Sequence, residues 1–76
     1  MTGQALTRDV AANVLWHFGQ GGYPSGAFTA TLLEAWGKAD PTNSALLGRA
    51  FPGLGHALEL ANLPGGIDRL KEIASA

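Results

Sequence analysis

The sequence predicts a single all-α domain, a compact bundle of about four to five short helices covering residues 1–76. Apolar residues recur at spacings of three and four along the whole chain, which is the pattern of a helix that buries one face. No segment alternates apolar and polar side chains as a half-buried strand does. Proline and glycine interrupt the pattern at short intervals, and no linker, repeat or low-complexity tract divides the chain.

The first helix is expected to begin after Thr7 and to stop near Gly19. Thr7 suits the N-cap position, where its hydroxyl accepts a bond from a free backbone N–H, and Asp9 in the first turn suits the helix dipole. Gly19 precedes a glycine-rich turn that ends the helix. The apolar stripe of this helix consists of Leu6, Val10, Val14 and Phe18, with His17 on the same side.

The second and third helices are predicted from their starting signals. Ser25 is a good N-cap for the second helix, and Asp40 followed by Pro41 is a strong start for the third. Pro52 must break or kink the chain after Phe51. The expected core face of the second helix is Phe28, Leu32, Ala35, Trp36 and Ala39, widened by Leu33. That of the third is Leu46, Leu47, Ala50 and Phe51.

Two further helices complete the predicted bundle. A fourth segment begins near Gly53 and is expected to end in the turn at residues 62–66. Its core face is Leu54, Ala57, Leu58 and Ala61, an i, i+3, i+4, i+7 set. The last helix is expected to bury Ile67, Leu70 and Ile73 and to expose Arg69, Lys71 and Glu72.

The composition predicts that the protein associates with itself. A domain of 76 residues buries only roughly 60 to 65% of its unfolded surface, so small folds gain stability from disulfides, metals or oligomerisation. There is no cysteine, and the two histidines, His17 and an exposed His56, are too few for a metal cage. Only 14% of the residues are charged, against about 25% in average domains, which favours an apolar interface.

The charge balance argues against bulk attraction to nucleic acid or to anionic lipid, because the formal net charge is −1. No run approaches the eighteen or so apolar residues of a membrane span. The N-terminus has no basic stretch followed by an apolar segment, so no secretion signal is expected. These features and the lack of cysteine are compatible with a cytoplasmic protein.

The loop of residues 21–26 is the first candidate ligand site. Its glycines precede a helix start, where free backbone N–H groups bind anions and glycine permits close approach of a phosphate. Ser25 and Gly26 would face the ligand, and Tyr23 would stack on a base or close the pocket. The loop lacks the Gly-Lys-Ser/Thr ending of a P-loop. The alternative is a tight turn with a serine cap.

Arg49 is the candidate for phosphate recognition, because its guanidinium fork suits bidentate contact. Asn43 shares its helix and lies about 120° around from it. The two side chains do not face each other directly, yet both can line a groove in an oligomer. The alternative is a solvent-exposed or glutamate-paired arginine without a ligand.

Trp16, Leu15 and His17 are the candidate interface residues. Trp16 lies about 140° away from the apolar stripe of the first helix, and Leu15 leaves the stripe on the other flank. A tryptophan on the far side of an amphipathic helix is typical of a subunit interface or a ligand surface. The alternative is a central first helix that is buried all round. His17, on the stripe, suits a core or interface position.

The sequence does not favour catalysis. Ser25, Ser44 and Ser75 do not occupy a nucleophile-elbow context, and no pair of carboxylates stands out. Asp68 and Glu72 form an ordinary exposed i, i+4 pair. We therefore expect a protein that is not an enzyme and needs no cofactor or metal.

A longer pattern resembles a recurrent family of small uncharacterised helical proteins of actinobacteria and their phages. It consists of Gly-Tyr-Pro-Ser-Gly-Ala-Phe-Thr at 22–29, Leu-Leu-Glu-Ala at 32–35, Ala39-Asp40, Asn43, Leu46-Leu47 and Phe51-Pro52. The resemblance covers residues 22–60, and Gly48 departs from it where a better helix former is expected. It implies a phage-encoded counter-defence or host-takeover factor acting in the host cytoplasm.

Three functions follow as hypotheses. The first is a homo-oligomer that sequesters a nucleotide-type signalling molecule, with Tyr23 or Trp16 stacking on the ligand and Arg49 pairing with its phosphate. The second is an inhibitor or adaptor that grips a host protein with the helix face around Trp16 and Leu15. The third is a small helix-turn-helix DNA-binding protein, which the net charge and the lack of a basic helix disfavour.

Overall fold

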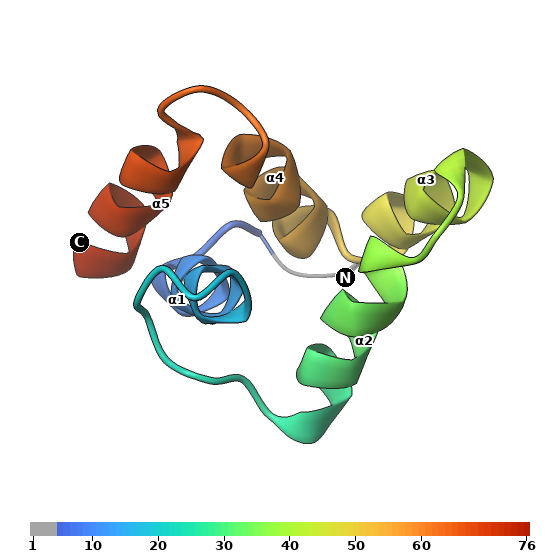
Figure 1. The fold of residues 1–76 in the computed structure, drawn as a ribbon, viewed down its shortest axis with the longest axis horizontal. Coiled ribbons are helices and arrows are strands. Elements are labelled where there is room, and N and C mark those ends of the chain that lie inside the picture. Colours follow the sequence, from blue (N-terminus) through green and yellow to red (C-terminus); the bar gives the residue numbers. More distant parts are fainter. Residues whose placement is uncertain (1–4) are drawn as a thin grey trace.

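The computed structural model describes residues 5–76 and shows five α-helices and no strand over that range. The predicted all-α bundle is therefore confirmed. Residues 1–4 lie outside the described residues. The expectation about a secretion signal concerns these residues in part. No helix of the described part is long and apolar enough to cross a membrane. The helices are α1 (Arg8–His17), α2 (Ala27–Gly37), α3 (Pro41–Ala50), α4 (Pro52–Ala61) and α5 (Gly66–Ser75) (Figure 1).

Local sequence signals explain three of the five helix starts. The Thr7 hydroxyl accepts a hydrogen bond from the backbone N–H of Val10 at 3.2 Å, and the Asp40 carboxylate accepts one from Asn43 at 2.8 Å. Pro52 occupies the first turn of α4 directly after the end of α3, so the predicted break is confirmed. Each of these signals acts within three residues, which is why the sequence alone locates them.

The predicted start of α2 is wrong by one residue. Gly26 is the N-cap, with φ −67° and ψ 169°, and it offers no side chain to the helix. The hydroxyl of Ser25 instead donates to the carbonyl oxygen of Gly26 at 3.3 Å. A serine caps a helix only from the N-cap position itself, so Ser25 lies one residue too early.

The core lies chiefly between α1, α4 and α5. We call these three helices the body. α1 packs most extensively against α5, and α4 contacts both. The largest fully buried side chains are Val14, Leu15, Leu33 and Leu70, each with about 2% or less of its surface exposed. The predicted core faces of α4 and α5 are confirmed, because Leu54, Ala57 and Leu70 are buried and their apolar neighbours half-buried.

α2 and α3 form a limb that extends from the body (Figure 1). α2 touches α1 over a short stretch, and α3 packs chiefly against α4. No residue of α3 is buried, and Leu46 is 54% exposed. Of the predicted core face of α3, only Leu47 and Phe51 pack against the core, because α3 meets the body on one narrow side.

The predicted core face of α2 is right for Leu33, Trp36 and the half-buried Leu32 and wrong for Phe28 and Ala35. Leu33 and Trp36 face the core, whereas Phe28 is 67% exposed and packs against the ring of Phe51, with ring centroids 6.0 Å apart. Leu33 lies about 140° around the helix from Phe28, at 100° per residue. The contact with α1 selects the Leu33 side, and the angle of the limb leaves the Phe28 side open.

Leu15 is a core residue, 2% exposed, so its predicted place at an interface is wrong. α1 is covered on several sides, because α4 and α5 pack against it and α2 touches it. The neighbouring Trp16 is nevertheless 53% exposed. α1 is therefore central to the fold without being buried all round.

Candidate ligand-binding groove

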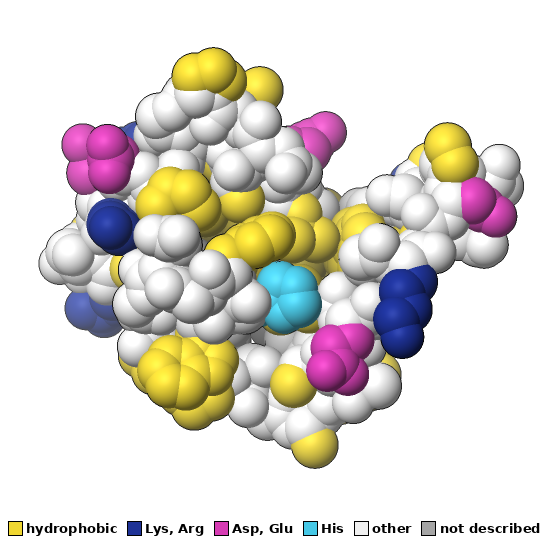
Figure 2. All heavy atoms as spheres, viewed as in Figure 1, with side chains coloured by type: hydrophobic (Ala, Val, Ile, Leu, Met, Phe, Trp, Pro, Cys, Tyr) yellow, Lys and Arg dark blue, Asp and Glu magenta, His cyan; other side chains and the backbone are white. Residues whose placement is uncertain are grey.

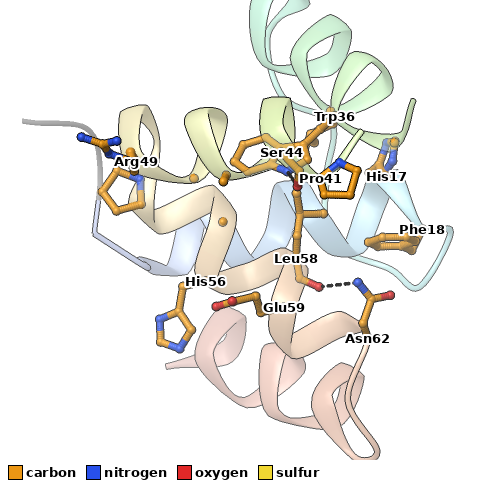
Figure 3. Close-up of a pocket in the computed structure, with 16 residues that line it drawn as sticks. His17, Phe18, Trp36, Pro41, Ser44, Arg49, His56, Leu58, Glu59 and Asn62 are labelled. Carbon is orange, nitrogen blue, oxygen red and sulfur yellow. Dashed lines mark hydrogen bonds between the residues drawn. The ribbon is translucent and has the colours of Figure 1, made fainter. Parts of the chain in front are cut away.

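A groove of about 820 Å³ lies between the limb and the body. Small-molecule sites typically enclose roughly 300 to 1,000 Å³, so the groove has a suitable size. Figure 2 shows apolar side chains gathered where the limb meets the body, with charged side chains mostly toward the margins of this face. The groove is lined by His17, Phe18, Leu33, Trp36, Gly37, Pro41, Ser44, Ala45, Gly48, Arg49, Pro52, Gly55, His56, Leu58, Glu59 and Asn62 (Figure 3).

The indole of Trp36 fixes the floor of the groove. Its Nε1–H donates to the hydroxyl of Ser44 at 3.2 Å, which ties α2 to α3, and the residue is only 8% exposed. Gly55 of α4 lies under the indole. A Cβ at this position would be 3.6 Å from the nearest ring atom of Trp36 and 3.2 Å from the Cα of Gly48. The missing side chain at Gly55 therefore lets α3 and α4 approach closely beneath the ring.

Polar side chains are distributed along the groove. In Figure 3, Arg49 and His56 lie toward one end, His17, Phe18 and Asn62 toward the other, and Glu59 between them. Within residues 5–76, no carboxylate lies within 4.0 Å of the Arg49 guanidinium, and the ion pair found there joins Arg69 to Glu72 at 3.0 Å. The cation of the groove is thus available to a ligand.

A smaller hollow of about 260 Å³ adjoins the groove. His17 and Leu33 line both, so the two hollows share a wall at the end of α1. We call it the side hollow, and it is lined by Asn13, Trp16, His17, Pro24, Ser25, Ala30, Leu33 and Glu34. Two of the sequence-predicted residues, Trp16 and Ser25, therefore lie beside the groove.

Tyr23 is held against α1 and lines neither hollow. Its hydroxyl donates to the carboxylate of Asp9, and its backbone N–H donates to the carbonyl oxygen of Ala12 at 3.4 Å. The side-chain amide of Asn13 donates to the Tyr23 carbonyl oxygen at 3.2 Å. Gly22, with φ +72°, permits this contact, because a Cβ there would collide with the backbone of Ala12. These bonds fasten the loop between α1 and α2 to the body.

The hydrogen bond to Asp9 affects the pH at which Tyr23 ionises. The phenol donates only while protonated, so this hydrogen bond, together with some desolvation and the nearby negative charge, raises the pKa of Tyr23 above its ordinary value of 10.0. A raised pKa means that this contribution to stability is complete below pH about 10 and is lost as the pH rises through the folded-state pKa.

We therefore expect Asp9→Asn to lower the pH at which Tyr23 ionises. Tyr23 is the single tyrosine, so near-ultraviolet absorbance of the phenolate reports it without ambiguity. Asp68→Asn, which alters an exposed carboxylate on α5, is the control and is expected to leave the titration unchanged. Identical titrations of the wild type and Asp9→Asn would show that the bond does not persist in solution.

The structure does not bring all predicted ligand residues together within one protomer. Arg49 lines the groove and Ser25 the side hollow. Tyr23, Gly26 and Asn43 line neither hollow. The backbone N–H of Asn43 is already used by the cap of α3. Tyr23 and Arg49 therefore do not line one hollow of the protomer.

The predicted interface residues are divided in the same way. Trp16 is exposed beside the side hollow, and Leu15 belongs to the core. His17 is exposed rather than buried on the apolar stripe, and its ring meets that of Phe18 edge-on at 5.0 Å. It is the one predicted interface residue that lines the groove.

Sequence reasoning did not identify Trp36, Ser44, Glu59 and Asn62 as groove residues. Their convergence depends on how α3 crosses α4, which no local motif encodes. One signal was present: Gly48 and Gly55 are glycines within α3 and α4, and glycine is unfavourable inside a helix.

The fold and the groove define the chain as a small all-α protein with an open cleft large enough for a small ligand. Comparison with known protein families, with curated proteins and with solved structures gave no match. The resemblance to proteins of actinobacteria and their phages stays a prediction from the residue pattern.

Proposed function

We propose that the protein is a non-catalytic, homo-oligomeric binding protein that holds a small anionic ligand of the nucleotide class in the groove. The observation that supports this most strongly is the combination of an unpaired cation, Arg49, with aromatic side chains in one cleft of about 820 Å³. Tight binding without turnover would remove a signalling molecule from the cell. In a phage-encoded protein, that activity would counter a host defence.

Arg49 supports the anionic part of the proposal. It is the single lysine or arginine that lines the groove, and its fork matches a phosphate bidentately. Glu59 lies farther along the groove and accepts hydrogen bonds without donating any when ionised. A ligand with a phosphate at one end and hydroxyl or amino donors toward the other would satisfy both residues, and nucleotides have this composition.

Aromatic side chains support the presence of a planar ring in the ligand. Phe18 is 42% exposed at the end of the groove opposite Arg49, so its ring is accessible for stacking. Trp36 contributes an edge of its indole to the floor, because the rest of the ring is buried. A ring between these two residues would contact apolar surface on two sides.

Exposed apolar side chains support self-association. Trp16, Phe28, Leu46 and Leu63 are each more than half exposed, and they include residues of both the limb and the body. Burial of large apolar side chains such as these is the usual source of affinity between subunits. An oligomer is also the arrangement in which Tyr23 of one protomer would approach Arg49 of another.

A protein-binding function is the second candidate, and the exposure of Trp16 favours it. An exposed tryptophan beside a hollow is a typical anchor for a protein partner. DNA binding gains no comparable support. The five cations are spread over several elements, at Arg8, Lys38, Arg49, Arg69 and Lys71.

A titration with two probes tests the proposal. ADP-ribose and a cyclic dinucleotide are added to the purified protein, and the tryptophan fluorescence is followed, since Trp36 lies in the groove. We expect one of them to bind, and Arg49→Ala to weaken its affinity by about 10- to 100-fold, because a hydrogen bond to a charged group contributes about 1.5–3 kcal/mol.

Arg69→Ala is the matched control, because Arg69 is an exposed arginine on α5 that does not line the groove. It is expected to bind like the wild type. Equal affinities of Arg49→Ala and the wild type would remove Arg49 from the site. Binding of neither probe, together with capture of a host protein that Trp16→Ala abolishes, would favour the protein-binding function.

A further inference from the structure

Gly48 lies in the last turn of α3 and on the wall of the groove. Glycine is among the least favourable residues in a helix interior, because it loses the most backbone freedom on folding. A Cβ at Gly48 would have no other atom within 4 Å. The conformation does not require glycine either, since Gly48 is not among the positive-φ glycines of the described residues.

The helix crossing does not explain Gly48. At the contact between α3 and α4, the missing side chain that matters is that of Gly55, whose added Cβ would press on the Cα of Gly48 at 3.2 Å. An added Cβ at Gly48 points instead into open space. The fold of the protomer therefore accommodates alanine at position 48, and alanine would make α3 more stable.

We infer that Gly48 is the position at which the ligand of the groove lies directly against the backbone of α3. This inference rests on the proposed function and adds a specificity-determining residue to it. Gly48 immediately precedes Arg49, and Ser44, which holds the indole of Trp36, lies one turn earlier on the same helix. A ligand that joins a phosphate at Arg49 to a flat aromatic ring on the Trp36 floor would pass over this bare stretch of helix.

The inference also defines the ligand more narrowly. A methyl group at position 48 would project into the space that such a ring occupies. A bulky, saturated group would not benefit from a flat, bare backbone surface. The recognised part of the ligand is therefore a planar heterocycle, such as a nucleobase, in van der Waals contact with α3.

Gly48→Ala tests the inference with two readouts that move in opposite directions. We expect a rise in melting temperature of about 4 °C, from the higher helix propensity of alanine. We expect the affinity for the better of the two probes, ADP-ribose or the cyclic dinucleotide, to fall at least tenfold. A glycine with a purely structural role would not show this combination of a higher melting temperature and weaker binding.

Thr42→Ala is the control, because Thr42 is exposed on the same helix and does not line the groove. It raises helix propensity and is expected to bind like the wild type. Unchanged affinity of Gly48→Ala, while Arg49→Ala still loses binding, would overturn the inference and leave the proposed function standing. Binding of neither probe to the wild type would overturn both.

Discussion

Gly66→Ala is expected to destabilise the native fold strongly. Gly66 is buried at the first residue of α5, and a Cβ there would collide with the backbone carbonyl of Leu60 in α4. Backbone cannot move aside as a flexible side chain does, so α5 would have to shift away from α4. α5 makes the most extensive contact with α1, and the shift would open the core along that side.

The expected loss of unfolding free energy for Gly66→Ala is about 3 kcal/mol or more. A domain of 76 residues has a total stability of roughly 4–11 kcal/mol, so such a loss removes a large share of it. Urea denaturation followed by circular dichroism measures it. Gly37→Ala is the control, since a Cβ at Gly37 meets nothing within 4 Å. A native-like transition for Gly66→Ala would show that the α4–α5 junction is looser than the structure indicates.

Leu70→Ala is expected to have the next largest effect. Leu70 is 0% exposed in the core, on the helix that packs most extensively against α1. Leucine-to-alanine substitutions in cores cost about 2–5 kcal/mol, and the cost is greatest where the neighbours cannot collapse into the cavity. Leu70 lies under two other helices, so we expect a value in the upper half of this range.

The matched control for Leu70→Ala is Leu63→Ala, which removes the same atoms from a side chain that is 57% exposed in the turn before α5. Its cost is expected to be below about 1 kcal/mol, in line with ordinary surface substitutions. The midpoints of urea denaturation compare the two variants directly. Similar midpoints would contradict the placement of α5 against α1.

The elements that the sequence predicted correctly are those controlled by neighbouring residues. Thr7, the Asp40-Pro41 pair and Pro52 mark helix boundaries through bonds or steric effects that act within a few residues. Ser25 shows the limit of such reasoning, because a shift of one residue moves its hydroxyl from the helix N–H groups to a neighbouring carbonyl. Capping chemistry predicts that a helix starts, and the backbone conformation decides where.

The predictions that failed depended on how the helices are arranged. Phe28 and Leu33 are equally apolar, and only the angle between the limb and the body decides that Leu33 is buried. Leu15 is buried rather than at an interface because α1 has neighbours on more than one side, which a single apolar stripe does not predict. Helical periodicity identifies apolar stripes, but it does not predict how many neighbours cover a helix.

The candidate site was predicted in part. Arg49 and His17 line the groove, and Trp16 and Ser25 line the side hollow next to it. Tyr23 was expected at the ligand, yet it binds Asp9 and fastens the loop to α1. The groove itself was not predictable, because it exists only where Gly55 lets α3 cross α4 beneath the indole of Trp36.

Native mass spectrometry of the wild-type protein, purified from cells under gentle conditions, tests the central claim most directly. A small binding protein with high affinity and no turnover keeps its ligand through purification. We predict an oligomer that carries added masses of a few hundred daltons, released on denaturation together with nucleotide absorbance. A monomer without added mass, from cells that contain the proposed class of ligand, would contradict the account.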